Sequence, residues 1–267
     1  MLTHEITDAY TAILHEELRP AMGCTEPIAV AYCAAKLHEV SGCVPERIEA
    51  ELSGNIQKNL KSAVVPNTGG LRGIKAAIAA GFTAGDPKLD LQVIAGVLPA
   101  QHELIRDFME NVPIKIKNAD TKRLLDIRLT AYHGGGKSVV HIANNHSNIV
   151  YIEHDGEIYL QKEMTDSPED SLRDKSVLNV KDIVTFADTV ELSLIEEPIE
   201  RQIAFNTALA EEGLRGEWGA NIGKILLAGA SNIETEAMAY AAAGSDARMS
   251  GCEKPAVILS GSGNQGI

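Results

Sequence analysis

Cys24 is the residue whose type and position best suit chemistry. It directly precedes Thr25, Glu26 and Pro27, which together favour a helix start. Threonine is a good cap, glutamate suits the positive end of the helix dipole, and proline is tolerated in the first turn. A thiol at this position meets the dipole and unpaired N–H groups that favour its thiolate, the form that binds iron or acts as a base or nucleophile. A buried, inert cysteine is the alternative, and the residues alone leave both open.

The other three cysteines are weaker candidates for a chemical role. Cys33 lies on the apolar stripe of the helix expected after Cys24, so we predict a core position for it. Cys43 stands in a turn and receives no role, and Cys252 is the only late cysteine. No pair has the C-x-x-C spacing of a zinc or redox motif, and we expect reduced thiols rather than a disulfide framework.

Three segments concentrate glycine and small polar residues: 66–70 (PNTGG), 244–251 (GSDARMSG) and 260–266 (SGSGNQG). Backbone N–H groups in such loops, helped by Ser, Thr and Asn side chains, can hold a carboxylate without a net positive charge. The last segment lacks the Gly-Lys-Ser/Thr ending of a phosphate loop, so a nucleotide site is not expected.

Histidines in the middle of the chain suggest two further sites. His133 and Lys137 flank three glycines and could attract an anion, and His146 could form hydrogen bonds within an asparagine-rich segment. Polar hairpin turns are the interpretation that we favour for both. No Ser-His-Asp ordering or His-Glu-x-x-His motif supports a hydrolase or a zinc protease.

Composition restricts the partners. The net charge of −13 and the pI near 5.1 repel phosphate backbones and anionic lipids, so neither nucleic acid nor a membrane is expected as a partner. The first residues lack the apolar core of a signal peptide, and no apolar stretch is long enough to span a bilayer. We therefore predict a cytoplasmic protein.

Periodicity predicts both helices and strands. Helices are expected at 4–18, 25–40, 71–80 and 101–109, and strands at 47–52, 91–97, 113–117, 124–131, 138–143 and 148–159. The segment 53–70 is predicted to be a loop. The result is an α+β fold in which a helical domain, formed by 1–85 and 193–267, is interrupted by an inserted α/β domain at 86–192. Small-residue stretches at 71–80 and 219–244 imply close helix packing, either within the chain or in a homodimer.

Four blocks, in order, resemble the signature of the L-cysteine desulfidase family. They are 22–27 (MGCTEP), 54–59 (GNIQKN) with 66–70 (PNTGG), 245–249 (SDARM) and 261–267 (GSGNQGI). That family is similar to the alpha part of bacterial iron–sulfur L-serine dehydratases. The resemblance extends over essentially the whole chain.

The resemblance implies a lyase that eliminates the β substituent of a small L-amino acid, leaving a keto acid and ammonia. L-Cysteine, which would yield pyruvate, hydrogen sulfide and ammonia, is the substrate implied by the GCTEP block and the inserted domain. The alternatives are an L-serine dehydratase and a non-catalytic amino-acid-binding module. The family also implies a 4Fe–4S cluster held by three cysteines, so that one iron stays open to the substrate.

Carried onto this sequence, the resemblance implies catalytic roles for Cys24, Thr25 and Glu26, with Cys24 as either cluster ligand or base. Amide-rich and glycine-rich positions would bind the substrate carboxylate and stabilise developing negative charge. The residues expected to do so are Asn55, Asn59, Asn67, Thr68, Gly69, Gly70, Ser260, Gly261, Ser262, Gly263, Asn264 and Gln265.

One departure concerns the cluster. The family's remaining cluster cysteines are expected downstream of the Ser-Gly-Asn-Gln block, beyond Ile267, and Cys33 and Cys43 do not match the expected blocks. We therefore predict that the complete enzyme carries a 4Fe–4S cluster, whereas this chain alone lacks a complete one and is inactive.

Overall fold

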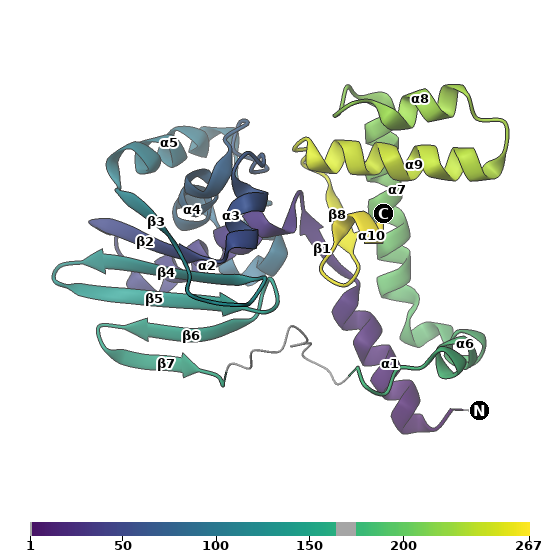
Figure 1. The fold of residues 1–267 in the computed structure, drawn as a ribbon, viewed down its shortest axis with the longest axis horizontal. Coiled ribbons are helices and arrows are strands. Elements are labelled where there is room, and N and C mark those ends of the chain that lie inside the picture. The colour runs from purple at the N-terminus through teal and green to yellow at the C-terminus, as the bar shows by residue number, and fades with distance from the viewer. Residues whose placement is uncertain (1, 164–174) are drawn as a thin grey trace. The chain divides into compact units, whose positions relative to one another are not determined.

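The computed structural model describes residues 2–163 and 175–267 (Figure 1). It contains both helices and strands in quantity, so the α+β class predicted from the sequence is confirmed. The described residues fall into two compact units. The sheet unit lies within 22–170 and 248–253, and the helical unit lies within 1–21, 171–247 and 254–267.

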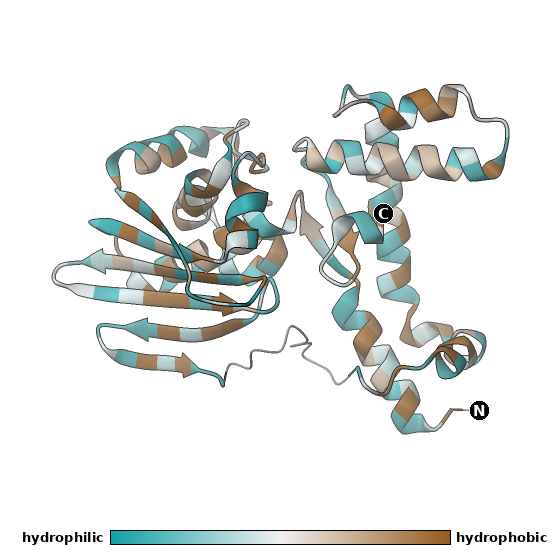
Figure 2. Cartoon of the chain, in the orientation of Figure 1, coloured by the Kyte–Doolittle hydropathy of each residue, from teal (hydrophilic) through white to brown (hydrophobic). Residues whose placement is uncertain are grey.

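A six-stranded sheet organises the sheet unit, in the order β3-β2-β4-β5-β6-β7. β2 and β3 are parallel, whereas the other neighbouring pairs are antiparallel. The strands carry both hydrophilic and hydrophobic residues (Figure 2), because successive side chains point to opposite faces. They are β2 (Arg47–Leu52), β3 (Ile114–Asn118), β4 (Asp126–His133), β5 (Gly136–Ala143), β6 (Ile149–His154) and β7 (Glu157–Gln161).

α2 (Thr25–Ser41) packs across β4 and β5 and against α4 (Gly73–Ala84). Cys33 on α2 is fully buried, and its thiol donates to the Val140 carbonyl of β5 at 3.5 Å, which confirms the predicted core position. The remaining helical elements of this unit are α3 (Gly54–Leu60), η1 (Pro87–Gln92), η2 (Pro99–Gln101) and α5 (His102–Asn111).

The α2 and α4 backbones touch at a single glycine. A β carbon at Gly81 would lie 2.0 Å from the carbonyl oxygen of Ala31, closer than any side chain can approach. Only glycine fits such an approach. The predicted close packing of the small-residue helix at 71–80 is thus formed within the chain.

The strand predicted at 91–97 is wrong. The segment is a 3-10 turn that ends at Gln92, followed by turns, although Leu91, Val93 and Ile94 are buried. The Asn67 side chain donates to the carbonyls of Ile94 and Ala95 at 2.9 and 3.1 Å. The side-chain amide of Asn67 thus forms hydrogen bonds with carbonyl groups that a neighbouring strand could otherwise satisfy. The apolar segment 91–97 does not form a strand.

The loop predicted at 53–70 contains a helix. α3 begins after Ser53, and its buried residues Ile56 and Leu60 lie four positions apart, so one face packs inward. The amide groups that suggested a loop lie on the remaining positions of this short helix, where Asn55 and Asn59 are exposed.

The unit boundaries differ from the domain boundaries expected near 86 and 192. β2, which was assigned to the first helical segment, is hydrogen-bonded between β3 and β4 within the sheet. α2, α3 and α4 also belong to the sheet unit, because their apolar faces pack within it.

The helical unit combines the start and the end of the chain. The side chain of Asn206 on α7 donates to the carbonyls of Val257 and Gly266 and accepts from the Val257 N–H at 2.8 Å, so it fixes β8 and α10. The elements are α1 (His4–Glu17), β1 (Arg19–Met22), α6 (Val180–Thr189), η3 (Leu192–Leu194), α7 (Glu196–Arg215), α8 (Ile222–Ala228), α9 (Ile233–Met249), β8 (Pro255–Ile258) and α10 (Gly263–Gly266). Within the described part of the chain, no helix has the length and apolar character that crossing a membrane requires.

Replacing Gly81 should destabilise the sheet unit strongly. We expect Gly81→Ala to lower the free energy of unfolding by about 1–3 kcal/mol or more, because the added methyl group must push the α2 backbone away. Urea unfolding followed by circular dichroism measures this. Gly54→Ala is the matched control: a β carbon there meets nothing within 4 Å, so stability should stay equal or rise slightly. Equal stability of the two variants would contradict the contact.

Candidate functional site

α2 begins directly after Cys24, as the sequence predicts, but its N-cap residue is Cys24 itself, whereas the sequence suggested Thr25 as the cap. Gly23, with φ of +54°, turns the chain into this cap, and a β carbon on it would lie 2.6 Å from the Pro66 ring. The turn that carries the thiol is therefore packed directly against the loop 66–70. The structure thus brings together two of the segments that the sequence singled out.

A carboxylate accepts a hydrogen bond from the thiol. Cys24 Sγ donates to Glu26 Oε2 at 2.9 Å, and Thr25 Oγ1 lies 3.4 Å from the same oxygen. The other oxygen, Oε1, accepts from the Asn59 side-chain amide of α3 at 2.9 Å. Four predicted site residues, Cys24, Thr25, Glu26 and Asn59, therefore form one hydrogen-bonded group.

The thiolate expected at Cys24 is not favoured. Burial, the charge of Glu26 and the hydrogen bond to Glu26 together raise the pKa of the thiol from 9.0 to about 12, although the charge of Arg248 acts in the opposite direction. The helix start is where the sequence places it, but the desolvated thiol faces an anion. The resting proton is therefore on the sulfur.

Glu26 is correspondingly an anion. Burial by itself would raise the pKa of its carboxyl group, but the hydrogen bonds from Cys24, the backbone and Asn59, together with the charge of His146, lower that pKa below 4.5. His146, which the sequence offered only as a hydrogen-bonding residue, is thus an electrostatic neighbour of this site.

Arg248 is the residue that the sequence reasoning missed. Its side chain is 5% exposed, and burial lowers the pKa of the guanidinium while Cys24 and Glu26 act to raise it. Arginine remains protonated in proteins, so a buried cation faces the thiol and carboxylate. The available signal was its place in the block 245–249, but 224 residues separate it from Cys24.

The predicted binding residues of the loop 66–70 have structural contacts. Asn67 adopts a positive φ of 56°, and its carbonyl oxygen lies 3.0 Å from His102 Nε2. Thr68 donates to the Val65 carbonyl at 2.7 Å and accepts from the Leu71 N–H. These contacts fix the loop beside Cys24 and leave Gly69 and Gly70 exposed. Substrate binding by this loop stays a prediction.

The loop 260–265 belongs to the helical unit. Ser262 caps the short α10 by accepting from the Gln265 N–H at 3.4 Å, and Ser260 has a positive φ of 49°. Gly263 is buried, whereas Asn264 and Gln265 are exposed. The substrate contacts predicted for this loop and for Asn55 also stay predictions.

The cysteines do not fit a cluster held by three thiolates. Cys33 is committed to the core, and Cys24 and Cys43 flank the 17 residues of α2, about 25 Å of helix. Cys252 is buried. Among the residues that the structure describes, the group of His, Cys, Asp and Glu side chains that could share an ion contains no cysteine.

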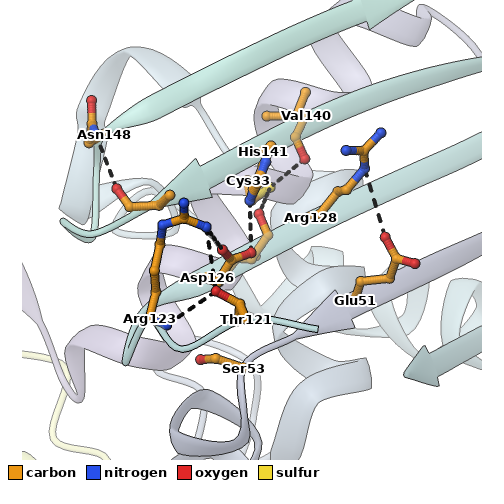
Figure 3. A network of polar contacts seen from close by, with 12 residues as sticks. Cys33, Glu51, Ser53, Thr121, Arg123, Asp126, Arg128, Val140, His141 and Asn148 are labelled. Carbon is orange, nitrogen blue, oxygen red and sulfur yellow. Dashed lines mark hydrogen bonds and ion pairs between the residues drawn. The ribbon is translucent and has the colours of Figure 1, made fainter. Parts of the chain in front are cut away.

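A buried charge network fixes the helix that supplies Asn59 (Figure 3). His141 Nε2 and Arg123 converge on the carboxylate of Asp126 at 2.7 and 3.2 Å, at the start of β4. The adjacent backbone then holds Ser53, whose N–H donates to the Asp126 carbonyl and whose hydroxyl donates to the Leu124 carbonyl. Because Ser53 begins α3, this network sets the position from which Asn59 reaches Glu26.

Comparison with known proteins agrees with the resemblance. Residues 88–267 match the sequence profile described as "Serine dehydratase alpha chain". Relatives named UPF0597 protein occur in Desulfitobacterium hafniense (48% identical over 259 residues), Finegoldia magna (44% over 260) and Treponema denticola (40% over 267). Each alignment covers 97% of this chain but 60–62% of the relative, so the chain spans about three fifths of their length. No solved structure matches significantly.

Cys24 should resist alkylation. With a pKa of about 12, on the order of one thiol in ten thousand is ionised at about pH 8, so iodoacetamide should modify Cys24 far more slowly than the exposed Cys43, with a rate that rises as the pH rises. Glu26→Gln removes the adjacent negative charge and should lower the Cys24 pKa and accelerate the reaction. Peptide mass spectrometry resolves the two cysteines. Equal rates at both, or an unchanged Cys24 rate in the variant, would contradict the contact.

Asp126→Asn should lower the free energy of unfolding by about 1–3 kcal/mol near neutral pH, since buried His141 and Arg123 lose their carboxylate. Burial would raise the Asp126 pKa, but these partners lower it from 3.8. Its contribution is therefore complete above about 3.8 and is lost as the pH falls through the folded-state value. Urea unfolding at neutral and acidic pH tests both points. Glu51→Gln, which removes a more exposed pair with Arg128 at 3.8 Å, should change stability by less than about 0.5 kcal/mol.

Proposed function

This chain belongs to the serine dehydratase alpha chain family, and from that premise we propose that it carries residues of a lyase site that eliminates the β substituent of a small L-amino acid. L-Cysteine, yielding pyruvate, hydrogen sulfide and ammonia, is the substrate we assign. The observation that carries the proposal is the group formed by the half-buried Cys24 and Glu26 and the buried Arg248, in which an oriented anion and a cation lie near each other.

Arg248 binds the substrate carboxylate in this proposal. A buried guanidinium suits a planar carboxylate, because it offers several donors in a fixed geometry. Neutralising the carboxylate also makes the neighbouring α carbon more acidic. The exposed backbone of Gly69 and Gly70, in the loop that packs beside Cys24, would contribute further donors.

Glu26 accepts the α proton. It is the ionised carboxylate of the group, and Cys24, Thr25 and Asn59 orient its two oxygens. As the proton moves to Glu26, the Cα–H electron pair forms the Cα–Cβ double bond, and the Cβ–S bond breaks to release hydrosulfide. The aminoacrylate product tautomerises to an imine, and water hydrolyses it to pyruvate and ammonia. Cys24 therefore acts as a positioning residue for Glu26 in its resting, protonated state.

The leaving group favours cysteine over serine. Hydrosulfide is a stable anion near neutral pH and departs without a proton, whereas hydroxide is the base of water, whose pKa is ~15.7. Serine would therefore need a proton donor, and the thiol beside the carboxylate is a weak one, since its pKa is about 12. L-Serine remains the second candidate because of the family's name.

The 4Fe–4S cluster that the resemblance implies would supply a Lewis acid at the leaving group. The four cysteines of this chain do not fit its three-thiolate set, and the steps above involve none of its atoms. To serve as a ligand of such a cluster, Cys24 would have to lose its proton and with it the hydrogen bond that it donates to Glu26.

Binding of L-cysteine tests the proposal without requiring turnover. We expect anaerobic calorimetry to show binding to the chain, with Arg248→Gln weakening it at least ten-fold and Arg248→Lys weakening it less. Arg215→Gln, at a 72% exposed side chain, is the control and should bind normally. L-Cysteine methyl ester, which lacks the carboxylate, should bind weakly to every variant. Undiminished affinity of Arg248→Gln for L-cysteine, or tight binding of the methyl ester, would contradict the assignment of Arg248 as the residue that binds the substrate carboxylate.

A further inference from the structure

Two hairpin turns of the sheet unit bring three metal-ligating side chains together. His133 ends β4 beside the turn to β5, and His154 and Asp155 lie at the turn from β6 to β7. Because β4, β5 and β6 are neighbours in the sheet, both turns lie at the same end of it. The His133 and His154 rings stack with centroids 5.4 Å apart.

Both imidazoles face one carboxylate. His133 Nε2 lies 3.9 Å from Asp155 Oδ1, and His154 Nε2 lies 3.8 Å from Asp155 Oδ2. One ligand atom from each of the three residues lies within 4.8 Å of the others. Two ligands of a tetrahedral zinc ion are about 3.3 Å apart, given bonds of about 2.0–2.1 Å. Closing the group around an ion therefore requires the ligand atoms, which lie up to 4.8 Å apart, to approach one another by up to about 1.5 Å at exposed turns.

A buried hydroxyl contacts both rings but orients only His154 for metal binding, because at His133 it lies against Nε2, the same nitrogen that faces Asp155, and an ion would replace that contact. Ser138 of β5 is fully buried, and its Oγ lies 2.8 Å from His154 Nδ1 and 3.1 Å from His133 Nε2. When the hydroxyl accepts from His154 Nδ1–H, the lone pair of His154 is on Nε2 and faces Asp155. Metal-binding histidines commonly donate their second ring N–H to such a partner, which fixes tautomer and direction.

The turn is also shaped to hold the carboxylate. Asp155 Oδ1 accepts from the Lys137 N–H at 2.9 Å, and a β carbon at Gly136 would lie 2.0 Å from that oxygen. Glycine at 136 thus leaves room for the carboxylate across the hairpin. The Lys137 ammonium pairs instead with Glu153 at 3.2 Å, so the anion site considered for His133 and Lys137 gives way to an arrangement that attracts a cation.

We propose that His133, His154 and Asp155 bind a divalent transition-metal ion of the zinc type, with Ser138 as a positioning residue. Two imidazoles and a carboxylate are a donor set that zinc accepts, and water completes the coordination. The ion ties the β4–β5 turn to the β6–β7 turn and so stabilises β7, which lies at one edge of the sheet. The site is independent of the group formed by Cys24, Glu26 and Arg248.

Zinc titration of the chelator-treated chain tests this site. We expect one zinc ion per chain and a higher midpoint of thermal unfolding with zinc. His133→Gln and His154→Gln should each weaken zinc binding at least ten-fold and abolish the thermal shift, whereas His4→Gln, at an exposed histidine of α1, should behave as the unchanged chain. The proposal is overturned if the unchanged chain binds no zinc, or if the two variants bind zinc as tightly as the unchanged chain does.

Two further measurements guard against misfolding and against binding by cysteine. Asp155→Asn keeps an acceptor for the Lys137 N–H, so it should fold normally by circular dichroism yet bind zinc more weakly. Cobalt substituted for zinc should give a spectrum without thiolate-to-metal charge-transfer absorption. If that absorption appears, the ion is bound by cysteine and the assignment to the two turns is wrong.

Discussion

The backbone contact between Ala31 and Gly81 is the constraint on which the site depends. It holds α2 against α4 without intervening side chains, while α2 also packs on β4 and β5, so the helix cannot shift without opening the core. The residue before α2 is Cys24, and the loop that packs against its turn leads into α4 through Pro66. The two segments that flank the thiol are therefore fixed by a single helix pair.

The position of the proton at Cys24 follows from a comparison of magnitudes. A helix start stabilises an anion by about 0.3–2 kcal/mol. Raising the thiol pKa from 9.0 to about 12 corresponds to about 4 kcal/mol in the opposite direction. Burial and the Glu26 carboxylate therefore outweigh the dipole and the backbone N–H of Glu26, which lowers the pKa of the thiol as well as that of the Glu26 carboxyl group. The negative charge at this helix start therefore lies on the Glu26 carboxylate and not on the Cys24 sulfur.

Capping preferences and hydrophobic periodicity predicted those features of the structure that depend on residues close together in the sequence. The helix start after Cys24, the core position of Cys33 and the strand at 47–52 depend on capping and periodicity, and the structure has all three. The segment 91–97 failed because Asn67, far away in sequence, satisfies its carbonyls. Arg248 was missed because its role depends on Cys24 and Glu26, which are distant from it in the sequence and close to it only in the folded chain. A single sequence contains no signal for contacts of that span.

Charge balance connects the site to the kind of ligand it can hold. Glu26 contributes one half-buried negative charge and Arg248 one buried positive charge, and burying a net charge without compensation is costly. A zwitterionic amino acid adds one charge of each sign, so its carboxylate can pair with Arg248 and its ammonium with Glu26 while the site stays neutral. A keto acid brings only the carboxylate and leaves Glu26 facing an additional anion. In the reaction that we propose, the two residues assigned to bind the amino acid therefore favour release of the keto acid, which is the direction that an eliminating lyase requires.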